Sequence, residues 1–283
     1  MVVICTFANY EAPGLRNWRS TMQKFGHTTV VLGMGKPWQG WMTRTQEYHD
    51  YLRTLPPTTV IVLMDAFDAL ACRSPEGLLE TYLNFNKPVV VSTENICVKS
   101  LNCQPLTKWW QQTHQTKNKY QYVNAGFLMG TAEGLSDICA YILKSGIQDD
   151  QLALGHYIET YPETVALDTQ SHLMGTLTMT GWLDFQKDKG QLIRKEMQTK
   201  PYFFHTPGIR WDLGRRYNTW GQQLLGNDFE PYDAPPDMVK HSGFRFGMWI
   251  LFWVLLILLL VAPKVALILL ILVFVYVLIM KYI

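Results

Sequence analysis

The sequence has no marked excess of charge of one sign. Its 25 lysines and arginines nearly balance its 23 aspartates and glutamates, which gives a formal net charge of +2 over 283 residues. A nucleic-acid-binding protein is expected to carry a basic face, so this balance argues against nucleic acid as a partner. Hydrophobic residues make up 48% of the chain, too large a share for a disordered protein. The composition is typical of a folded domain of ordinary size.

The chain also has few cysteines. There are five, an odd number without the paired spacing of a disulfide framework, so we expect reduced thiols. No Asn-X-Ser/Thr sequence is present to accept an N-linked glycan. Residues 1–7 are apolar but lack the basic segment and the cleavage site of a secretion signal, so we interpret them as a strand. Together these absences predict that the folded part faces the cytosol.

Long apolar runs are missing except at the end of the chain. Residues 248–283 are apolar apart from Pro263, Lys264 and Lys281. As helices, residues 247–262 and 265–280 would each rise roughly 24 Å, against a hydrocarbon layer of about 30 Å. Either one kinked helix spans the bilayer or a hairpin turns at Pro263-Lys264. The hairpin is favoured, because a lysine facing lipid would cost about 3 kcal/mol. We predict a folded domain over 1–240 and an anchor over 241–283, with a lipid bilayer as partner.

Strand-like and helix-like segments alternate along the folded part. This alternation predicts an α/β fold with a mixed, mostly parallel sheet flanked by helices. Residues 95–120 are long and irregular, so they are a candidate lid or acceptor loop. The expected strands are 2–7, 28–32, 59–64, 89–92, 127–131 and 203–204, and the expected helices are 15–25, 40–55, 132–144 and 149–161, with another starting at 74–76.

Two carboxylates follow the uncharged strand 59–64. Ligands of α/β sheets bind at the carboxyl ends of the strands, where Asp65 and Asp68 are expected to lie. Oxygen ligands at this spacing suit Mg²⁺ or Mn²⁺. The pattern is common, however, and in the alternative interpretation Asp65 caps the next turn while Asp68 is solvated.

Further polar residues stand at the ends of other elements. His205 follows an apolar strand and precedes Thr-Pro-Gly, where it is placed to be a third ligand, although a lone histidine is more often structural. Asn124 stands beside small residues that let a ligand approach the backbone. Asp149 and Asp150 open a helix, where capping of the helix dipole is the alternative role.

Six segments, taken in order, resemble motifs of the glycosyltransferase domain of the multifunctional collagen lysyl hydroxylases and its viral relatives. The resemblance runs from about residue 1 to residue 220. No single motif is decisive, but the common order and spacing are specific. The segments are 31–40 (VLGMGKPWQG, similar to V-L-G-x-G-x-x-W-x-G), 65–68 (DAFD, similar to D-x-[YF]-D), 92–97 (STENIC, similar to S-A-E-x-x-C), 122–130 (YVNAGFLMG, similar to Y-L-N-S-G-G-F-I-G), 149–152 (DDQL) and 205–208 (HTPG, similar to H-G-N-G).

The resemblance implies a GT-A fold that transfers a hexose from a UDP-sugar with Mn²⁺, or with Mg²⁺. It implies metal ligands, nucleotide contacts and residues around the sugar and the acceptor. By this resemblance the metal ligands are Asp65, Asp68 and His205; the donor contacts are Phe7, Asn9, Trp38, Asp65, Phe67, Gly208 and Arg210, with Phe67 stacked on uracil; and the catalytic group is Glu94, Asn124, Asp149 and Asp150.

The chemistry of these residue types agrees with the implied roles. A leaving diphosphate develops negative charge, and a divalent ion held by carboxylates and an imidazole stabilises that charge. Asp149 or Asp150 is suited to orient an acceptor hydroxyl or to stabilise an oxocarbenium-like centre.

The sequence departs from the family pattern mainly on the sugar side. Trp41 stands where the family tends to have a second glycine, Ala125 replaces a serine, and the Gly-rich, lysine-containing loop is shortened to residues 43–50. We predict a membrane-anchored glycosyltransferase that uses UDP-glucose or UDP-galactose and acts on a protein or glycan hydroxyl, with hydroxylysine of a collagen-like chain as the acceptor that the resemblance suggests. The alternatives are an inactive sugar-binding or scaffolding relative and a metal phosphohydrolase that uses the same two aspartates.

Overall fold

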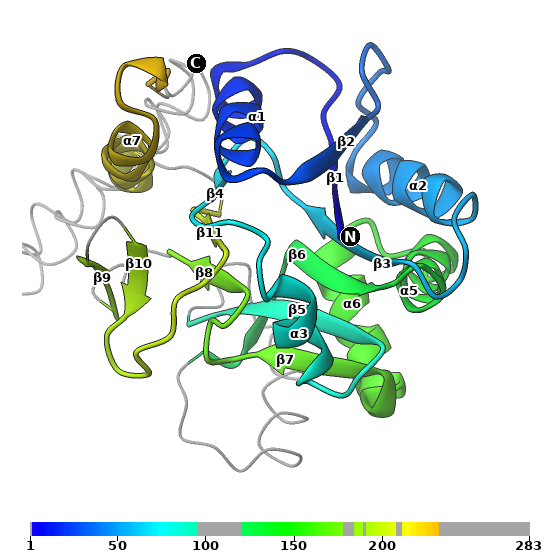
Figure 1. The fold of residues 1–283 in the computed structure, drawn as a ribbon. Coiled ribbons are helices and arrows are strands. Elements are labelled where there is room, and N and C mark those ends of the chain that lie inside the picture. The colour runs from blue at the N-terminus through cyan, green and yellow to red at the C-terminus, as the bar shows by residue number, and fades with distance from the viewer. Residues whose placement is uncertain (1, 96–119, 178–183, 189–190, 208–210, 232–283) are drawn as a thin grey trace, which may run out of the picture. The chain divides into compact units, whose positions relative to one another are not determined.

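The computed structural model describes residues 2–95, 120–177, 184–188, 191–207 and 211–231 (Figure 1). The chain divides into two units, Met1–Tyr232 and Asp233–Ile283. The second unit, which contains the whole predicted anchor at residues 241–283, lies outside the described residues. Within the described ranges, no helix has the length and apolar character needed to cross a bilayer.

A six-stranded sheet forms the centre of the first unit. Its order is β2-β1-β3-β6-β5-β7, and β6 runs antiparallel to both of its neighbours while the other neighbours pair in parallel. The prediction of a mixed α/β sheet flanked by helices is therefore confirmed. The strands are β1 (Val3–Phe7), β2 (Thr28–Leu32), β3 (Val60–Met64), β5 (Val89–Glu94), β6 (Tyr122–Thr131) and β7 (Val165–Asp168).

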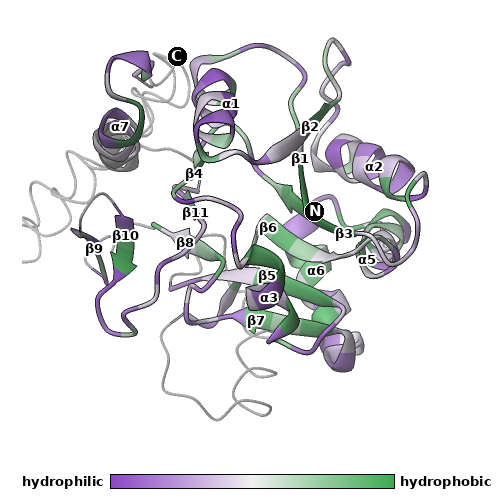
Figure 2. Cartoon of the chain, viewed as in Figure 1, coloured by the Kyte–Doolittle hydropathy of each residue, from purple (hydrophilic) through white to green (hydrophobic). Residues whose placement is uncertain are grey.

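Helices cover both faces of this sheet because apolar residues of its strands pack into a core on either side. Figure 2 shows the hydrophobic colouring of β1 and β3. Successive residues of β1 join different cores: Cys5 packs with α2, α5 and α6, whereas Ile4 packs with α1 and α3. Figure 1 shows α2 and α5 lying side by side. The helices are α1 (Pro13–Phe25), α2 (Trp41–Leu52), α3 (Leu78–Leu83), α5 (Ala132–Lys144) and α6 (Asp150–Thr160), with a short 3-10 turn η2 (Pro162–Thr164) after α6.

A smaller, three-stranded sheet combines β4 (Ala69–Ala71), which follows β3 in the chain, with two strands from later in the unit. In it β11 (Phe203–His205) lies between β4 and β8 (Met174–Thr176). The β11–β4 pairing is antiparallel and sets His205 opposite Ala69. The β11–β4 pairing brings the end of β11 beside the residues that follow β3. A hairpin of β9 (Phe185–Asp188) and β10 (Gln191–Arg194) follows β8 in the chain.

The last described helix is fastened to the first one. After α7 (Trp211–Leu225) and the 3-10 turn η4 (Gly226–Asp228), the side chain of Asn17 in α1 donates to the Glu230 carbonyl (2.6 Å) and accepts from the Glu230 amide (2.9 Å). The Arg16 guanidinium pairs with the Glu230 carboxylate (2.5 Å). These contacts tie the end of the described chain to its beginning.

One expected helix start was wrong. The Ser-Pro-Glu sequence at 74–76 predicted the start of a helix, but α3 begins at Leu78. Gly77, just before it, has a φ of 74°, in the left-handed region, so residues on its two sides cannot belong to one helix. The Tyr202 hydroxyl also donates to the carbonyl of Glu76 (2.9 Å), which holds the turn in place.

Candidate active site

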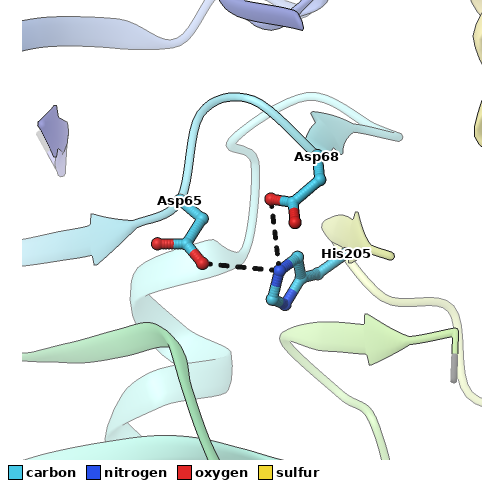
Figure 3. Close-up of side chains that lie close together, drawn as sticks. All are labelled: Asp65, Asp68 and His205. Atoms are coloured by element: carbon cyan, nitrogen blue, oxygen red, sulfur yellow. Dashed lines mark ion pairs between the residues drawn. The ribbon is translucent and has the colours of Figure 1, made fainter. Parts of the chain in front are cut away.

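The three predicted metal ligands meet where the six-stranded sheet and the smaller sheet adjoin. Asp65 directly follows β3, Asp68 lies between β3 and β4, and His205 ends β11 (Figure 3). Nε2 of His205 lies 3.5 Å from Oδ2 of Asp65 and 3.3 Å from Oδ1 of Asp68. One ligand atom from each residue falls within 4.8 Å of the others, a geometry that could hold a metal ion. Two carboxylates and an imidazole fit a hard divalent ion such as Mn²⁺ or Mg²⁺.

The loop that carries the two carboxylates is held at both ends by backbone hydrogen bonds. The amide of Asp65 donates to the carbonyl of Gly126 in β6 (3.0 Å). The carbonyl of Asp68 accepts from the amide (2.9 Å) and the hydroxyl (3.1 Å) of Thr206, the residue after His205. The Asp68 side chain is 15% exposed, which does not fit the alternative of a solvated carboxylate. The Asp65–Asp68 loop is therefore held by hydrogen bonds to β6 at one end and to the residue after β11 at the other.

Asn124 fixes the orientation of the histidine. Its Oδ1 accepts a hydrogen bond from the amide of Gly126 (3.0 Å), and Nδ1 of His205 lies 3.1 Å from the same oxygen. Because that oxygen can only accept, Nδ1 carries the proton, and in neutral imidazole the lone pair of Nε2 faces the carboxylates. A Cβ on Gly126 would stand 2.2 Å from Cε1 of His205. The Asn-Ala-Gly segment thus seats the imidazole and selects its tautomer.

Burial and charge act in opposite directions on the ionisable groups of the cluster. Burial lowers the pKa of His205, but the carboxylates of Asp68 and Asp65 outweigh it, so the pKa is raised. Burial raises the pKa of Asp65, and the nearby Arg44 guanidinium opposes this only in part. Both shifts mean that the cluster favours added positive charge, which a divalent cation would supply.

A buried arginine, which the sequence reasoning missed, joins the candidate metal cluster to one of the predicted acceptor residues. Arg44 on α2 donates from Nη1 to Oδ1 of Asp65 and from Nη2 to Oδ2 of Asp150. Its side chain is 9% exposed, and the guanidinium carbon lies 4.9 Å from the centroid of the Trp41 ring. A signal was available: Arg44, Tyr48 and Leu52 recur at a spacing of four, which puts all three on the inward face of α2.

The predicted sugar and acceptor residues gather around the start of α6. Oδ1 of Asp149 accepts from the amides of Gln151 and Leu152 (both 3.1 Å), so Asp149 caps α6, as its alternative interpretation predicted. Nε2 of Gln151 donates to Oε1 of Glu94 (3.2 Å), and its Oε1 accepts from the amide of Ala125 (3.1 Å). Gln151, which the sequence reasoning did not single out, therefore links β5, β6 and α6.

The three aromatic residues predicted at the donor site take part in two ring pairs near the ends of β1 and β3. The rings of Phe7 and Trp38 lie 5.7 Å apart, and those of Tyr10 and Phe67 stack at 5.2 Å with an angle of 23° between their planes. Tyr10 was not foreseen, although it closely follows a strand end. Gly33 has a φ of 81°, and a Cβ there would stand 2.1 Å from the Phe7 ring, so the segment after β2 can wrap around Phe7 only with glycine.

Three other residues were predicted to contact the donor: Asn9, Gly208 and Arg210. The side-chain amide of Asn9 donates to the backbone carbonyl of Lys36 (3.2 Å). The backbone carbonyl of Asn9 accepts from the amide of Gly35 (3.0 Å). Asn9 thereby supports the loop that carries Trp38. The predicted diphosphate contacts Gly208 and Arg210 lie outside the described residues, and so does most of the candidate acceptor loop at 95–120.

Comparison with known sequences adds a family match. Residues 1–215 match a family model described as "PLOD GT domain". An uncharacterized protein of Acanthamoeba polyphaga mimivirus is 24% identical over 213 residues, which cover 70% of this chain and 44% of that protein. The multifunctional procollagen lysine hydroxylase and glycosyltransferase LH3 of Rattus norvegicus is 21% identical over 233 residues, covering 73% of this chain and 29% of LH3. The chain thus spans less than half the length of these relatives.

Among solved structures, a glycosyltransferase involved in the glycosylation of the major capsid of PBCV-1 overlaps with a TM-score of 0.48 and 11% sequence identity. The overlap covers 77% of this chain and 98% of that protein.

Proposed function

The chain belongs to the PLOD GT domain family, and from that premise we propose that it is a divalent-metal-dependent glycosyltransferase that transfers glucose or galactose from a UDP-sugar to a hydroxyl group. One observation supports the metal dependence above all. Asp65, Asp68 and His205 offer ligand atoms within 4.8 Å of one another, with the imidazole tautomer set by Asn124. A hard cation needs ligands of this kind in a fixed arrangement.

The chain's own groups divide the work of binding the donor. Asp65 and Asp68 would supply oxygen ligands and His205 a nitrogen ligand to Mn²⁺ or Mg²⁺, which when bound would supply positive charge against the leaving diphosphate. The Phe67 ring, already stacked on Tyr10, would extend its stack to the uracil, with Phe7, Asn9 and Trp38 along the nucleoside. Gly208 and Arg210 would contact the diphosphate.

The acceptor side is proposed on the four polar residues near the start of α6. Glu94, Asn124, Asp149 and Asp150 would surround the transferred sugar and the acceptor hydroxyl. Their hydrogen bonds would keep the carboxylates in fixed positions while the hydroxyl is oriented. LH3 is named as a procollagen lysine hydroxylase and glycosyltransferase, so hydroxylysine in a collagen-like peptide is the proposed acceptor, with a glycan hydroxyl as the second choice.

The test measures UDP release by the full chain. The protein is incubated with UDP-glucose or UDP-galactose and Mn²⁺, with and without a hydroxylysine-containing collagen-like peptide, and with and without EDTA. We expect release that depends on the metal and increases with the peptide. Release that EDTA leaves unchanged would contradict the metal site. No turnover by a folded, metal-binding protein would favour the inactive relative, and phosphate release without sugar transfer would favour a phosphohydrolase.

We further propose that residues 241–283 hold this domain at a membrane surface. Support comes from the apolar sequence of residues 248–283, in which Pro263, Lys264 and Lys281 are the exceptions. Flotation of the full chain with phospholipid vesicles, followed by carbonate extraction, tests the anchor. We expect the protein to float and to resist extraction. A protein that stays at the bottom of the gradient would contradict the proposal.

A further inference from the structure

Arg44 contacts a predicted metal ligand and a predicted acceptor residue at the same time. Its two terminal nitrogens bind different carboxylates, Asp65 and Asp150, which come from different elements. The side chains of Arg44 and Asp150 are 9% and 10% exposed, so water screens their charges little. An arginine guanidinium keeps its positive charge in proteins, and here two carboxylates pair with it.

The groups that form the metal cluster or pair with Arg44 have a simple balance of charge. Asp65, Asp68 and Asp150 contribute three negative charges when ionised, and Arg44 contributes one positive charge, which leaves minus two for these four groups. A divalent ion brings this sum to zero, while Glu94 and Asp149 lie outside the sum and add negative charge on the acceptor side. Without the arginine, the same groups would keep one negative charge with the metal bound, which disfavours a diphosphate approaching that metal.

We propose that Arg44 is the positioning residue that balances the charge of the site, so that the metal-loaded protein accepts an anionic diphosphate. Arg44 acts through Asp65 and Asp150 and does not itself need to touch the donor. The inference rests on the proposed function, because it concerns the same metal and the same nucleotide. Trp41, whose ring covers the guanidinium, shields this charge from water.

This role separates metal binding from nucleotide binding. Loss of the positive charge should not weaken the attraction of the remaining carboxylates for a cation. It should instead weaken the binding of UDP to the Mn²⁺-loaded protein. The charge of Arg44 is separated from the metal site by a single carboxylate, that of Asp65. At the effective dielectric of a protein site, we expect its removal to lower the affinity for UDP roughly tenfold or more. A role in side-chain geometry alone would predict the opposite, with metal affinity falling first.

The experiment uses calorimetry on the full chain, with Mn²⁺ alone and then UDP at saturating Mn²⁺. Four variants are compared with the wild type: Arg44→Gln removes the charge, Arg44→Lys keeps it, Arg44→Gln with Asp150→Asn restores the sum, and Arg19→Gln removes an arginine from an exposed ion pair with Glu11 as the control. Thermal melts of the metal-free proteins report folding. The double variant also guards against a misfolded Arg44→Gln, since it leaves no unpaired Asp150 carboxylate.

We expect Arg44→Gln to bind Mn²⁺ at least as tightly as the wild type but to bind UDP roughly tenfold or more weakly. Arg44→Lys, the double variant and Arg19→Gln should stay close to the wild type in both measurements. Wild-type UDP affinity in Arg44→Gln, or a double variant as weak as Arg44→Gln, would overturn the inference alone. A wild-type chain that binds neither Mn²⁺ nor UDP would overturn the proposed function together with the inference.

Discussion

The candidate site has two ends that are built in different ways: the metal end, with Asp65, Asp68 and His205, and the proposed nucleoside end, with Phe7, Tyr10, Trp38 and Phe67. The metal end is buried: His205 is 2% exposed, and hydrogen bonds hold its imidazole and the backbone of the Asp65–Asp68 loop. The nucleoside end is open: Tyr10 is 57% and Trp38 44% exposed, and ring contacts and glycine turns hold it. The first end is shaped before any ligand arrives, whereas the second has aromatic surface still to be covered. Changes at the two ends should therefore have different consequences.

The largest expected effect is the loss of a ligand at the metal end. Asp68→Ala should reduce metal-dependent UDP release by at least about 100-fold, since even partners of ligands cost 10–100-fold when removed. Thermal stability should change little, because the substitution relieves repulsion between neighbouring carboxylates. Asp50→Ala, an exposed aspartate on α2, is the matched control. Unfolding of the Asp68 variant would instead indicate a structural role for this carboxylate.

The next effect concerns the residue that seats the histidine. Asn124→Ala removes the acceptor for Nδ1 of His205, so the imidazole loses its fixed tautomer. We expect Mn²⁺ affinity to fall about 10–100-fold. Calorimetry measures this directly, with Asn84→Ala, an exposed residue at the end of α3, as the control. Unchanged Mn²⁺ binding in the Asn124 variant would show that the metal end does not need this support, and the contrast between the two ends would weaken.

A smaller effect is expected at the nucleoside end. Phe67→Ala removes one ring of the Tyr10–Phe67 stack and should weaken UDP binding by about 1–3 kcal/mol, the usual value for stacking of a base on an aromatic ring. Mn²⁺ affinity should stay the same, because the metal end is formed independently. Tyr161→Ala removes another exposed ring and serves as the control. A parallel loss of Mn²⁺ binding would break the distinction between the ends.

The smallest effect concerns a buried histidine outside both ends of the site, His27. Burial lowers the pKa of His27, while its Nε2 donates to the Arg73 carbonyl (2.9 Å). The unfolded chain then binds the proton more readily than the folded one, so stability should fall as the pH drops below about 6.5. His27→Gln keeps a donor but does not titrate, and should lose less stability on acidification. Chemical denaturation at pH 7.5 and 5.5 measures the difference, and equal losses in both proteins would contradict it.

The sequence was most informative where a function depends on residues close together in the chain. The uncharged run before Asp65 predicted β3 and placed both aspartates at its carboxyl end, and the apolar run before His205 predicted β11. The strand-end position of His205 and the family resemblance also suggested that these segments meet, but β3 and β11 lie in different sheets, so strand order did not require it. The prediction that a helix starts at residues 74–76 was wrong, because a capping pattern does not reveal that Gly77 adopts a left-handed conformation.

The role of Asn124 marks the limit of such reasoning. The sequence placed this amide beside small residues and predicted a ligand contact. The structure adds that its oxygen supports His205, 81 positions further along the chain. Gly126 takes part for the same reason, because only a residue without Cβ lets the imidazole lie against β6. No spacing rule connects these positions, since their contact depends on how two sheets meet.

The sequence by itself determined the α/β fold, the family and the three residues of the metal cluster, because periodicity and short motifs are local properties of the chain. Only the tertiary structure decided what surrounds that cluster. Arg44 lies 21 positions from Asp65 and 106 from Asp150, and these three residues meet because α2 and the start of α6 come together at the carboxyl end of β3. A buried charge is acceptable only beside its partners, and long-range packing is what brings those partners together.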